Sequence, residues 1–478
     1  MSPSSPSTAP VSRPFDAAVS LPPPTAGLDA PRSPAATDLS MPSPMVSPMP
    51  SPMVSPMVSP MPADASSSPS ACSAPQTARL ITGPGVWMES DATAQLAATL
   101  KLAGCVRAVG MPDLHPGSGH PIGAAVATRG VVHPHLIGGD AGCGARLVVT
   151  TVERMDADRL ERRINDAFDE DLLAAADPAA LFAAAWHHGA RGLAEVEGLP
   201  EGLRKLASRE PAVDELPVSG DLARYRGFER SLGTIGGGNH FAEVTRVTSV
   251  ADSQTAATLG LVRNALVVLA HSGSRGLGTA LGLAWSGGPT DDDARPLPRF
   301  LGELAGACRF ARANRLILTY RLLVALGALR DHTLRGGFDI VHNDVREEQV
   351  EGASAWVHRK GVAPAYAGAP TIVLGSRGAP SWILRGTGAE HGLCSVAHGA
   401  GRRMTRAEAT AKLKHRYRRA ELARAALGGR TICDDSALLY EEHPDAYKAI
   451  EPVISALEQA KLATRVAALT PVVTVKRA

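Results

Sequence analysis

The sequence predicts a mixed α+β fold in which one large folded domain follows an irregular tail. Residues 157–209 repeat Ala, Leu, Glu and Arg at helical spacing, whereas 262–270 is the near-continuous apolar run of a strand buried on both faces. Such segments alternate without the regular strand–helix–strand repeat of a parallel α/β domain. With 478 residues, 44% of them apolar, the chain can bury a large core of mixed sheets and helices.

The first 76 residues have a composition that cannot support a packed core. They consist mainly of Ser, Pro, Ala and Met, and prolines recur every few residues, as in Ser43-Pro-Met-Val-Ser-Pro-Met-Pro50. Proline removes backbone donors and prevents helix formation. We expect residues 1–76 to be a disordered tail, or to result from a start codon assigned too early, and residues 77–478 to form the folded domain.

The remaining elements are expected in the following order. Short strands at 106–109 and 123–128 flank a loop at 111–120, and another strand leaves a glycine-rich loop at 146–152. After the helical region and the buried strand come an exposed loop at 287–298, a long helix at 301–329, two strands around a turn within 371–384, a basic helix at 406–427 and a final strand at 471–476.

Composition excludes several classes of protein. The formal charge is +2 and the sequence pI is about 8.2, so no global basic field points to nucleic acid, and a polyanionic partner must be held by local arginines. Six scattered cysteines form no paired framework, which indicates free thiols in a reducing compartment. No apolar run approaches the roughly 20 residues of a membrane span, and the N-terminus lacks signal-peptide features. We therefore expect a cytoplasmic protein with no membrane partner.

The glycine-rich segment Gly138–Gly144 carries Asp140 three residues before Cys143. Glycines allow positive φ and close backbone approach, so both side chains can face one point. Each residue alone, like each later histidine, is better explained by ordinary packing, but the set is not. One carboxylate, one thiol and three imidazoles suit a transition metal, and five ligands favour two ions sharing the thiolate. The candidate ligands are Asp140, Cys143, His240, His271 and His342.

Two further glycine-rich loops are candidate phosphate sites. Gly233–Gly238 precedes Asn239-His240, and Leu374–Gly378 precedes Ser381. Clustered backbone N–H groups at such loops can bind anions, although each loop taken alone is better explained as an ordinary turn, and neither has Walker A spacing. Glu243 is a candidate acceptor for the N–H donors of a guanine edge.

His398 lies in a glycine-rich turn, Ala397–Arg402, that leaves room for a bulky ligand beside its ring. A neutral imidazole there could attack phosphorus, or it could merely bind a phosphate. Lys476 is either a phosphate-neutralising charge or a solvated C-terminal lysine. Four arginines in or beside the loops could hold phosphates or form surface ion pairs: Arg275, Arg359, Arg377 and Arg402. Asp113, His115 and His120 would form a pocket wall, with Asp113 orienting a ligand.

The ordered set of motifs resembles the RtcB family of GTP-dependent RNA ligases over residues 111–476, and within it the branch coupled to release factor H. The residues that carry the resemblance are Met111–His115, Gly139–Gly144, Gly236–Glu243, His271–Gly276, His342-Asn343, Val357–Gly361, Gly375–Gly378 and His398–Arg402. Ala141, Asp344, Arg377 and Pro380 differ from the residues common in that family.

The resemblance implies an RtcB-like catalytic domain with two Mn²⁺ ions on the five candidate ligands and His398 as the nucleophile that becomes guanylylated by GTP. It further implies that GMP passes to an RNA 3′-phosphate, present as such or made from a 2′,3′-cyclic phosphate, and that a 5′-hydroxyl then displaces GMP. The implied guanylate contacts are Asn239, His240, Phe241, Ala242, Glu243, His342, Asn343, Leu374, Gly375, Ser376, Arg377, Ser381, His398, Gly399, Ala400, Gly401 and Lys476.

Two alternatives remain, of which the first uses the same metal ions and the second is not enzymatic. One is a manganese-dependent phosphoesterase or cyclic phosphodiesterase of RNA ends, which would need neither GTP nor His398. The other is a tRNA or rRNA repair factor that acts with a peptide-chain release factor.

Overall fold

A computed structural model describes residues 77–213, 222–286, 288–290, 297–425 and 427–477, all within one compact unit. The tail expected at 1–76 and part of the exposed loop expected at 287–298 lie outside these residues. The described part is a mixed α+β domain, as the sequence predicts. No helix in this part combines the length and the apolar character needed to cross a bilayer.

The strands form three sheets. A five-stranded sheet has the order β1-β2-β3-β9-β8, a two-stranded sheet pairs β10 with β13, and the largest sheet has the order β11-β12-β15-β5-β6-β4-β7, with β14 added beside β15. The strands are β1 Thr77–Leu80, β2 Cys105–His115, β3 Ile122–Thr128, β4 Gly144–Thr150, β5 Phe241–Val250, β6 Leu266–Ser272, β7 Leu334–Val341, β8 Asn343–Val350, β9 Ala353–Lys360, β10 Val362–Pro364, β11 Pro370–Val373, β12 Ser381–Gly386, β13 Ser395–Ala397, β14 Arg430–Ile432 and β15 Ala463–Val475.

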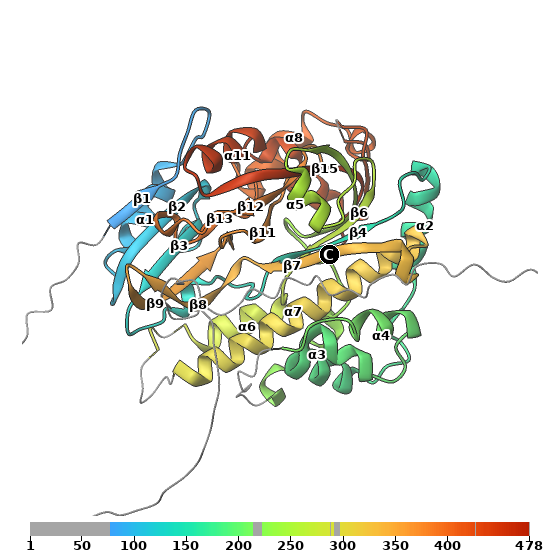
Figure 1. Cartoon of the computed structure of the whole chain (residues 1–478), viewed down its shortest axis with the longest axis horizontal. Helices are drawn as coiled ribbons and strands as arrows, with labels where there is room; N and C mark the ends of the chain where they lie inside the picture. The colour runs from blue at the N-terminus through green and yellow to red at the C-terminus, as the bar shows by residue number, and fades with distance from the viewer. Residues whose placement is uncertain (1–76, 214–221, 287, 291–296, 426, 478) are drawn as a thin grey trace, which may run out of the picture. The chain divides into compact units, whose positions relative to one another are not determined.

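The helices pack against the faces and ends of these sheets (Figure 1). They are α1 Ser90–Thr99, α2 Ala157–Asp169, α3 Pro178–Gly192, α4 Glu201–Ala207, α5 Ser253–Thr258, α6 Gly276–Ala284, α7 Leu297–Leu326, α8 Arg406–Lys414, α9 Arg419–Leu422, α10 Ser436–Glu441 and α11 Ile450–Gln459.

The long helix α7 organises one side of the domain. It packs against β4 and β6 on one side and against α3 on the other, as the yellow helix in Figure 1 shows. Side chains are buried around most of its circumference, which is the expected state of a helix enclosed by other elements. Gly306 on α7 allows close contact with α3, because a Cβ there would lie 2.3 Å from the indole of Trp186. The predicted long helix is therefore confirmed, shifted by a few residues.

The strand predictions hold with changes at their ends. The apolar run at 262–270 overlaps β6, which begins only at Leu266 and ends at Ser272. Asn264 adopts a positive φ of 72° in the turn that precedes the strand. All residues of β6 are buried, as predicted for a strand covered on both faces. The final strand is longer than expected: β15 spans 13 residues and pairs with β5, β12 and β14.

Two predictions of local structure are wrong. The basic helix expected at 406–427 is broken into α8 and α9, because Tyr417 between them turns inward to donate a hydrogen bond to Asp445 and stack on His443. The loop expected at 111–120 is strand as far as His115, since β2 continues through a register irregularity between Gly110 and His115. Asp113 is thereby placed on a buried strand.

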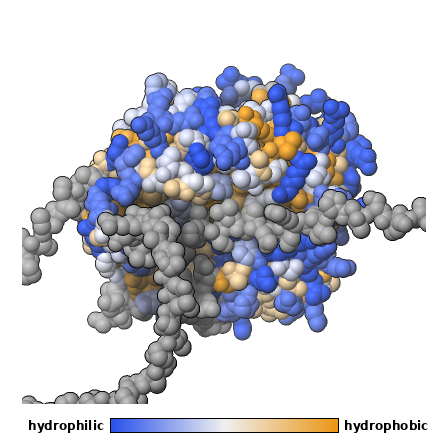
Figure 2. Space-filling model, in the orientation of Figure 1, coloured by the Kyte–Doolittle hydropathy of each residue, from blue (hydrophilic) through white to orange (hydrophobic). Residues whose placement is uncertain are grey.

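The face shown in Figure 2 is mainly hydrophilic where it is coloured, with apolar side chains in small separate groups. Extended apolar patches mark protein or membrane interfaces, and scattered groups need no such explanation. The features that suggest chemistry lie instead at one edge of the largest sheet.

Candidate active site

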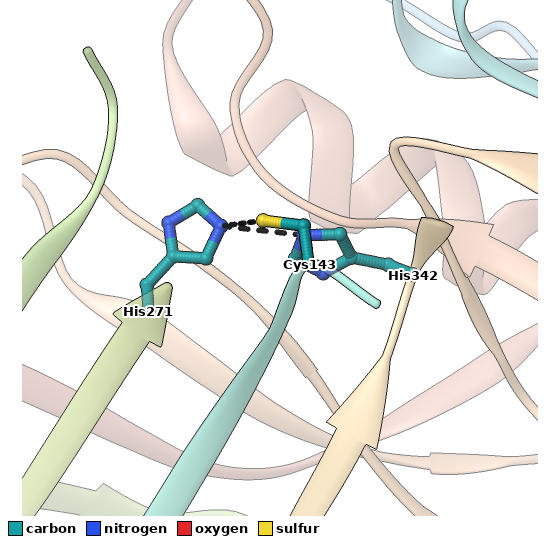
Figure 3. Close-up of side chains that lie close together, drawn as sticks. All are labelled: Cys143, His271 and His342. Carbon is teal, nitrogen blue, oxygen red and sulfur yellow. Dashed lines mark hydrogen bonds between the residues drawn. The ribbon is translucent and has the colours of Figure 1, made fainter. Parts of the chain in front are cut away.

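Strand direction brings the candidate metal ligands together. β4 pairs antiparallel with both β6 and β7, so the start of β4 lies beside the ends of its two neighbours. Cys143 comes directly before β4, His271 lies near the end of β6 and His342 comes directly after β7. Figure 3 shows the three side chains turned toward one another from these strand ends. His240 reaches the same edge because β5 begins beside it, with Phe241 opposite His271.

Each donor atom of the five candidate ligands lies 3.0–3.4 Å from at least one other. Sγ of Cys143 is 3.3 Å from Nε2 of His240 and 3.4 Å from Nε2 of His271. Nε2 of His271 is 3.2 Å from Nε2 of His342. Oδ2 of Asp140 is 3.0 Å from Nε2 of His240. The atoms form two groups of three that could each hold an ion, Cys143–His271–His342 and Asp140–Cys143–His240, and the two groups share the thiol.

Burial controls the protonation of this cluster. It lowers the pKa of His271 and His342 well below the usual value, and neighbouring imidazoles add to the effect, so both rings are neutral with a lone pair to offer. Burial and the charge of Asp140 raise the pKa of Cys143 far above that of a free thiol. Burial opposes ionisation of Asp140, but contacts with His240 and Arg275 outweigh it and lower its pKa. The donor set therefore fits a cation that would stabilise the thiolate.

A layer of backbone and side-chain contacts orients the ligands. Nδ1 of His271 donates to the carbonyl oxygen of Asn239 at 3.2 Å, which directs Nε2 into the cluster. The side-chain amide of Asn343 donates to the Asp140 carbonyl at 3.0 Å and accepts from the N–H of Gly361 at 2.7 Å. Asn343 thus supports the metal side of the site.

Arg275 lies against the cluster. Its backbone N–H donates to Oδ1 of Asp140 at 3.0 Å, and its guanidinium donates to Nδ1 of His240 at 2.8 Å. A guanidinium has no acceptor, so Nδ1 of His240 accepts this bond. A cation on Nε2 would require the proton on Nδ1, and Arg275 would then have to turn away. Gly236 provides the space for this side chain, since a Cβ there would overlap the guanidinium.

His398 lies at the border between the cluster and a pocket of about 350 Å³. Its ring centroid is 5.0 Å from that of His342. Nδ1 donates to Oδ2 of Asp113 at 2.8 Å, and this carboxylate is fully buried. No hydrogen bond to Nε2 occurs among the described residues, so Nε2 is the ring nitrogen available for chemistry.

The pocket collects most of the expected guanylate contacts. Leu374 N–H donates to the His398 carbonyl at 2.9 Å, which places the two glycine-rich loops side by side. Twelve of the expected residues line the pocket: Asn239, Phe241, Glu243, Leu374, Gly375, Ser376, Arg377, His398, Gly399, Ala400, Gly401 and Lys476. The pocket wall does not include Ala242, which is buried in β5, or Ser381, whose hydroxyl accepts from Gly375 N–H at 3.0 Å. His240, His342 and Asn343 belong to the metal side.

Glu243 and Lys476, which both line the pocket, have strongly shifted pKa values. Burial raises the pKa of Glu243 to about 8, although the Thr474 hydroxyl and the charge of Lys476 oppose the shift. Burial lowers the pKa of Lys476 to about 8, and its Nζ donates to the His240 carbonyl at 2.8 Å. Lys476 is only 4% exposed, so its reading as a solvated lysine is wrong.

Comparison with known proteins identifies the family. The sequence model of the family described as "tRNA-splicing ligase RtcB" matches residues 95–288 and 290–477. This chain belongs to the RtcB family. It is 36% identical over 405 residues to RNA-splicing ligase RtcB2 of Escherichia coli, covering 83% of this chain and 94% of that protein. It is 32% identical over 436 residues to RNA-splicing ligase RtcB of Mycobacterium tuberculosis, covering 78% and 98%. It is 30% identical over 442 residues to tRNA-splicing ligase RtcB of Archaeoglobus fulgidus, covering 80% and 90%.

The arginines of this RtcB-family chain divide into two kinds. Arg377 and Arg402 line the pocket, and Arg275 lies beside the metal cluster. Arg359, which the sequence suggested as a phosphate ligand, is fully buried in β9 and binds the Glu348 carboxylate with two hydrogen bonds of 2.6 and 3.0 Å. The Glu348 carboxylate on the neighbouring strand β8 already neutralises its charge, so Arg359 stabilises the fold and does not bind phosphate.

Sequence reasoning missed two groups of residues. Thr405, Arg406, Glu442, Tyr447 and Thr474 also line the pocket, but no motif marked them. The bond from Asp113 to His398 was also missed, since Asp113 was expected to orient a ligand. His120 lies outside the wall that His115 helps to form, and its ring stacks on His135.

Arg315 on α7 was missed as well. It binds three segments that carry candidate metal ligands, at Gly142, Ser272 and Asp339. The side chain is completely buried. Its NH1 donates to the carbonyl oxygens of Gly142 and Ser272, both at 2.8 Å, beside Cys143 and His271. Nε and NH2 bind the two oxygens of Asp339 on β7, at 2.9 and 2.6 Å. Helix α7 carries several arginines, and nothing in the sequence marks Arg315 for this role.

Proposed function

We propose that the chain is an RNA ligase that uses GTP and two Mn²⁺ ions to join RNA 3′-phosphate or 2′,3′-cyclic phosphate ends to 5′-hydroxyl ends, in RNA repair or tRNA splicing. The observation that carries this proposal is the position of His398 between a shared-thiol metal cluster and a guanylate-sized pocket. Membership of the RtcB family and the names of its relatives support RNA ligation.

His398 would act as the nucleophile. Asp113 holds Nδ1–H, so the lone pair of Nε2 faces the reaction and a positive charge developing on the ring is stabilised. Nε2 would attack the α-phosphorus of GTP and pyrophosphate would leave. The RNA 3′-phosphate would then take GMP from His398, and the 5′-hydroxyl would displace GMP to form the new phosphodiester bond.

The pocket would hold the guanylate. A charged Glu243 would accept from the guanine N–H donors, while the backbone N–H groups of the loops at 374–378 and 398–401 and the Lys476 ammonium would face the phosphate. Asp140, Cys143, His240, His271 and His342 would hold the two metal ions. Bound metal would supply charge stabilisation for the attacking and leaving oxygens.

The proposal extends to the organisation of the chain. Residues 77–478 would form the catalytic domain, and residues 1–76 would contribute nothing to the site. The five cysteines in the described part are free thiols, which fits a reducing compartment such as the cytoplasm. A peptide-chain release factor is proposed as a functional partner on the resemblance to that branch of the family.

Radiolabelled GTP tests the central step. We expect wild-type protein with Mn²⁺ to retain label after denaturation, and His398→Ala to retain none. His332→Ala is the matched control, because this histidine is exposed and precedes the start of β7, the end of that strand opposite His342. The same proteins should join defined 3′-phosphate and 5′-hydroxyl ends only with GTP. If the protein hydrolyses cyclic-phosphate ends equally well without GTP, and His398→Ala retains this activity, the ligase proposal fails and a phosphoesterase takes its place.

A further inference from the structure

Trp87 is the most exposed tryptophan in the described part of the chain. Its side chain is 54% exposed, whereas Trp186 and Trp285 are buried and Trp356 and Trp382 are partly buried. An indole exposed to water lacks the large free energy that its burial would contribute, and exposed tryptophans are typical of binding surfaces. Trp87 lines a separate pocket of about 430 Å³, together with Pro112, Arg403, Lys448 and Pro452.

One face of the Trp87 indole contacts the ammonium group of Lys448. Nζ of Lys448 lies 5.6 Å from the ring centroid of Trp87, over the ring. The same Nζ donates to the Leu114 carbonyl at 2.6 Å and lies 3.4 Å from the Glu89 carboxylate. These contacts fix Lys448 over one face of the indole, and the Trp87 side chain as a whole remains 54% exposed.

Arg403 adds an uncompensated positive charge to the pocket. Its Nε donates to the backbone carbonyl of Asp445 at 2.8 Å, and it forms no ion pair with any described carboxylate. The one acidic side chain that faces Lys448, Glu89, is already paired with it. The pocket therefore combines an exposed aromatic face with a free guanidinium, the two features of sites that bind single-stranded nucleic acid.

Residues that line this pocket are chain neighbours of residues in the candidate active site. Pro112 precedes Asp113, which binds His398, and Lys448 follows Tyr447, which lines the guanylate pocket. The backbone N–H of Lys448 donates to the carbonyl of Gly401 at 2.9 Å, and Gly401 also lines that pocket. The Trp87 pocket is therefore joined to the candidate active site through the segments around Pro112 and Lys448.

We propose that the Trp87 pocket binds a nucleobase of the RNA substrate, with the base stacked on the open face of the indole and a phosphate on Arg403. The inference rests on the proposed RNA ligase function and adds a binding site outside the catalytic pocket. A stacking platform recognises any base, so the site would contribute affinity without sequence preference.

Equilibrium binding of a fluorescein-labelled single-stranded RNA with a 3′-phosphate, measured without GTP, tests the site separately from catalysis. We expect Trp87→Ala to raise the Kd about fivefold to one hundredfold, the usual range for loss of one stacked base. Trp87→Phe should stay close to wild type because phenylalanine retains a stacking face. Arg403→Ala should weaken binding and reduce its salt dependence. Leu283→Ala, at a side chain 71% exposed and distant in sequence, should change nothing.

Self-guanylylation with radiolabelled GTP, measured without RNA, distinguishes the two hypotheses. We expect all four variants to become labelled like wild type. If Trp87→Ala is labelled normally and also binds RNA like wild type, the inference is overturned while the ligase proposal stands. If wild type takes no label, the ligase proposal fails, and the binding series still reports on Trp87. A protein partner whose binding depends on Trp87, with RNA affinity unchanged, would also overturn the inference.

Discussion

Oδ2 of Asp113 accepts a 2.8 Å hydrogen bond from Nδ1 of His398, from a strand 285 residues earlier in the chain. This carboxylate is completely buried, so water does not compete for the bond. Its position fixes the tautomer of the proposed nucleophile and directs Nε2 away from the strand. The reactivity of His398 should therefore depend on a residue outside the pocket wall.

Asp113→Ala should slow self-guanylylation at least one hundredfold, because the imidazolium formed by attack loses its counter-charge and Nδ1–H loses its acceptor. Asp113→Asn should be intermediate, since an amide oxygen can still accept the bond. The rate of label transfer from GTP measures the effect, while calorimetric Mn²⁺ binding should stay close to wild type. Equal rates for wild type and Asp113→Ala would exclude a role for the carboxylate.

Metal stoichiometry tests the shared thiol. Wild type should bind two Mn²⁺ ions by calorimetry, and His342→Ala should bind one tightly, because only the group with His271 loses a ligand. Cys143→Ser should weaken both ions, since the thiol belongs to both groups and a hydroxyl is a poor ligand. His332→Ala serves as the exposed control. Loss of a single ion in Cys143→Ser would show that the thiol is not shared.

Arg315→Met should reduce both stability and metal affinity. Removing one member of a buried ion pair typically costs about 3–5 kcal/mol. Arg312, whose Nε lies 3.6 Å from Oδ1 of Asp339, still partly offsets the carboxylate charge, so the loss should lie toward the lower end of this range. Denaturant unfolding of the metal-free protein measures this loss. The double variant Arg315→Met/Asp339→Leu should recover part of the stability, since no buried charge is left unpaired. Its Mn²⁺ affinity should remain low, because the Gly142 and Ser272 carbonyls still lack their donor.

GTP affinity should depend on pH through Glu243. Burial raises the pKa of this carboxyl to about 8, so it is mainly protonated in the empty pocket at neutral pH. The charged form is the one proposed to accept from guanine, so binding should release a proton, and affinity should rise with pH up to about 8 by at most about tenfold per pH unit. Calorimetry in buffers of different ionisation enthalpy measures the number of protons released on GTP binding.

Glu243→Gln is the matched variant for this measurement. It has the same shape but no titrating group, so its GTP binding should be weaker and should release no proton from this position. Proton release of the same size in wild type and Glu243→Gln would assign the pH dependence to another group.

Several elements could be predicted from local pattern alone. The apolar run that overlaps β6 and the long helical stretch of α7 follow from burial and periodicity within each segment, so both predictions are confirmed. The basic helix at 406–427 failed because its break depends on Tyr417 contacting Asp445 and His443, residues that no local pattern links to it.

By itself the sequence determined the chemical character of the site: soft and hard donors in glycine-rich loops, one further histidine in a glycine-rich turn, and motifs sufficient to suggest the family. Only the tertiary structure decided which of them meet. Cys143 and His271 lie 128 residues apart, and they touch because antiparallel pairing aligns the start of β4 with the end of β6. Arg359, in an equally suggestive motif, faces Glu348 instead. Strand register, which long-range packing sets, decides that Cys143 meets His271 whereas Arg359 meets Glu348.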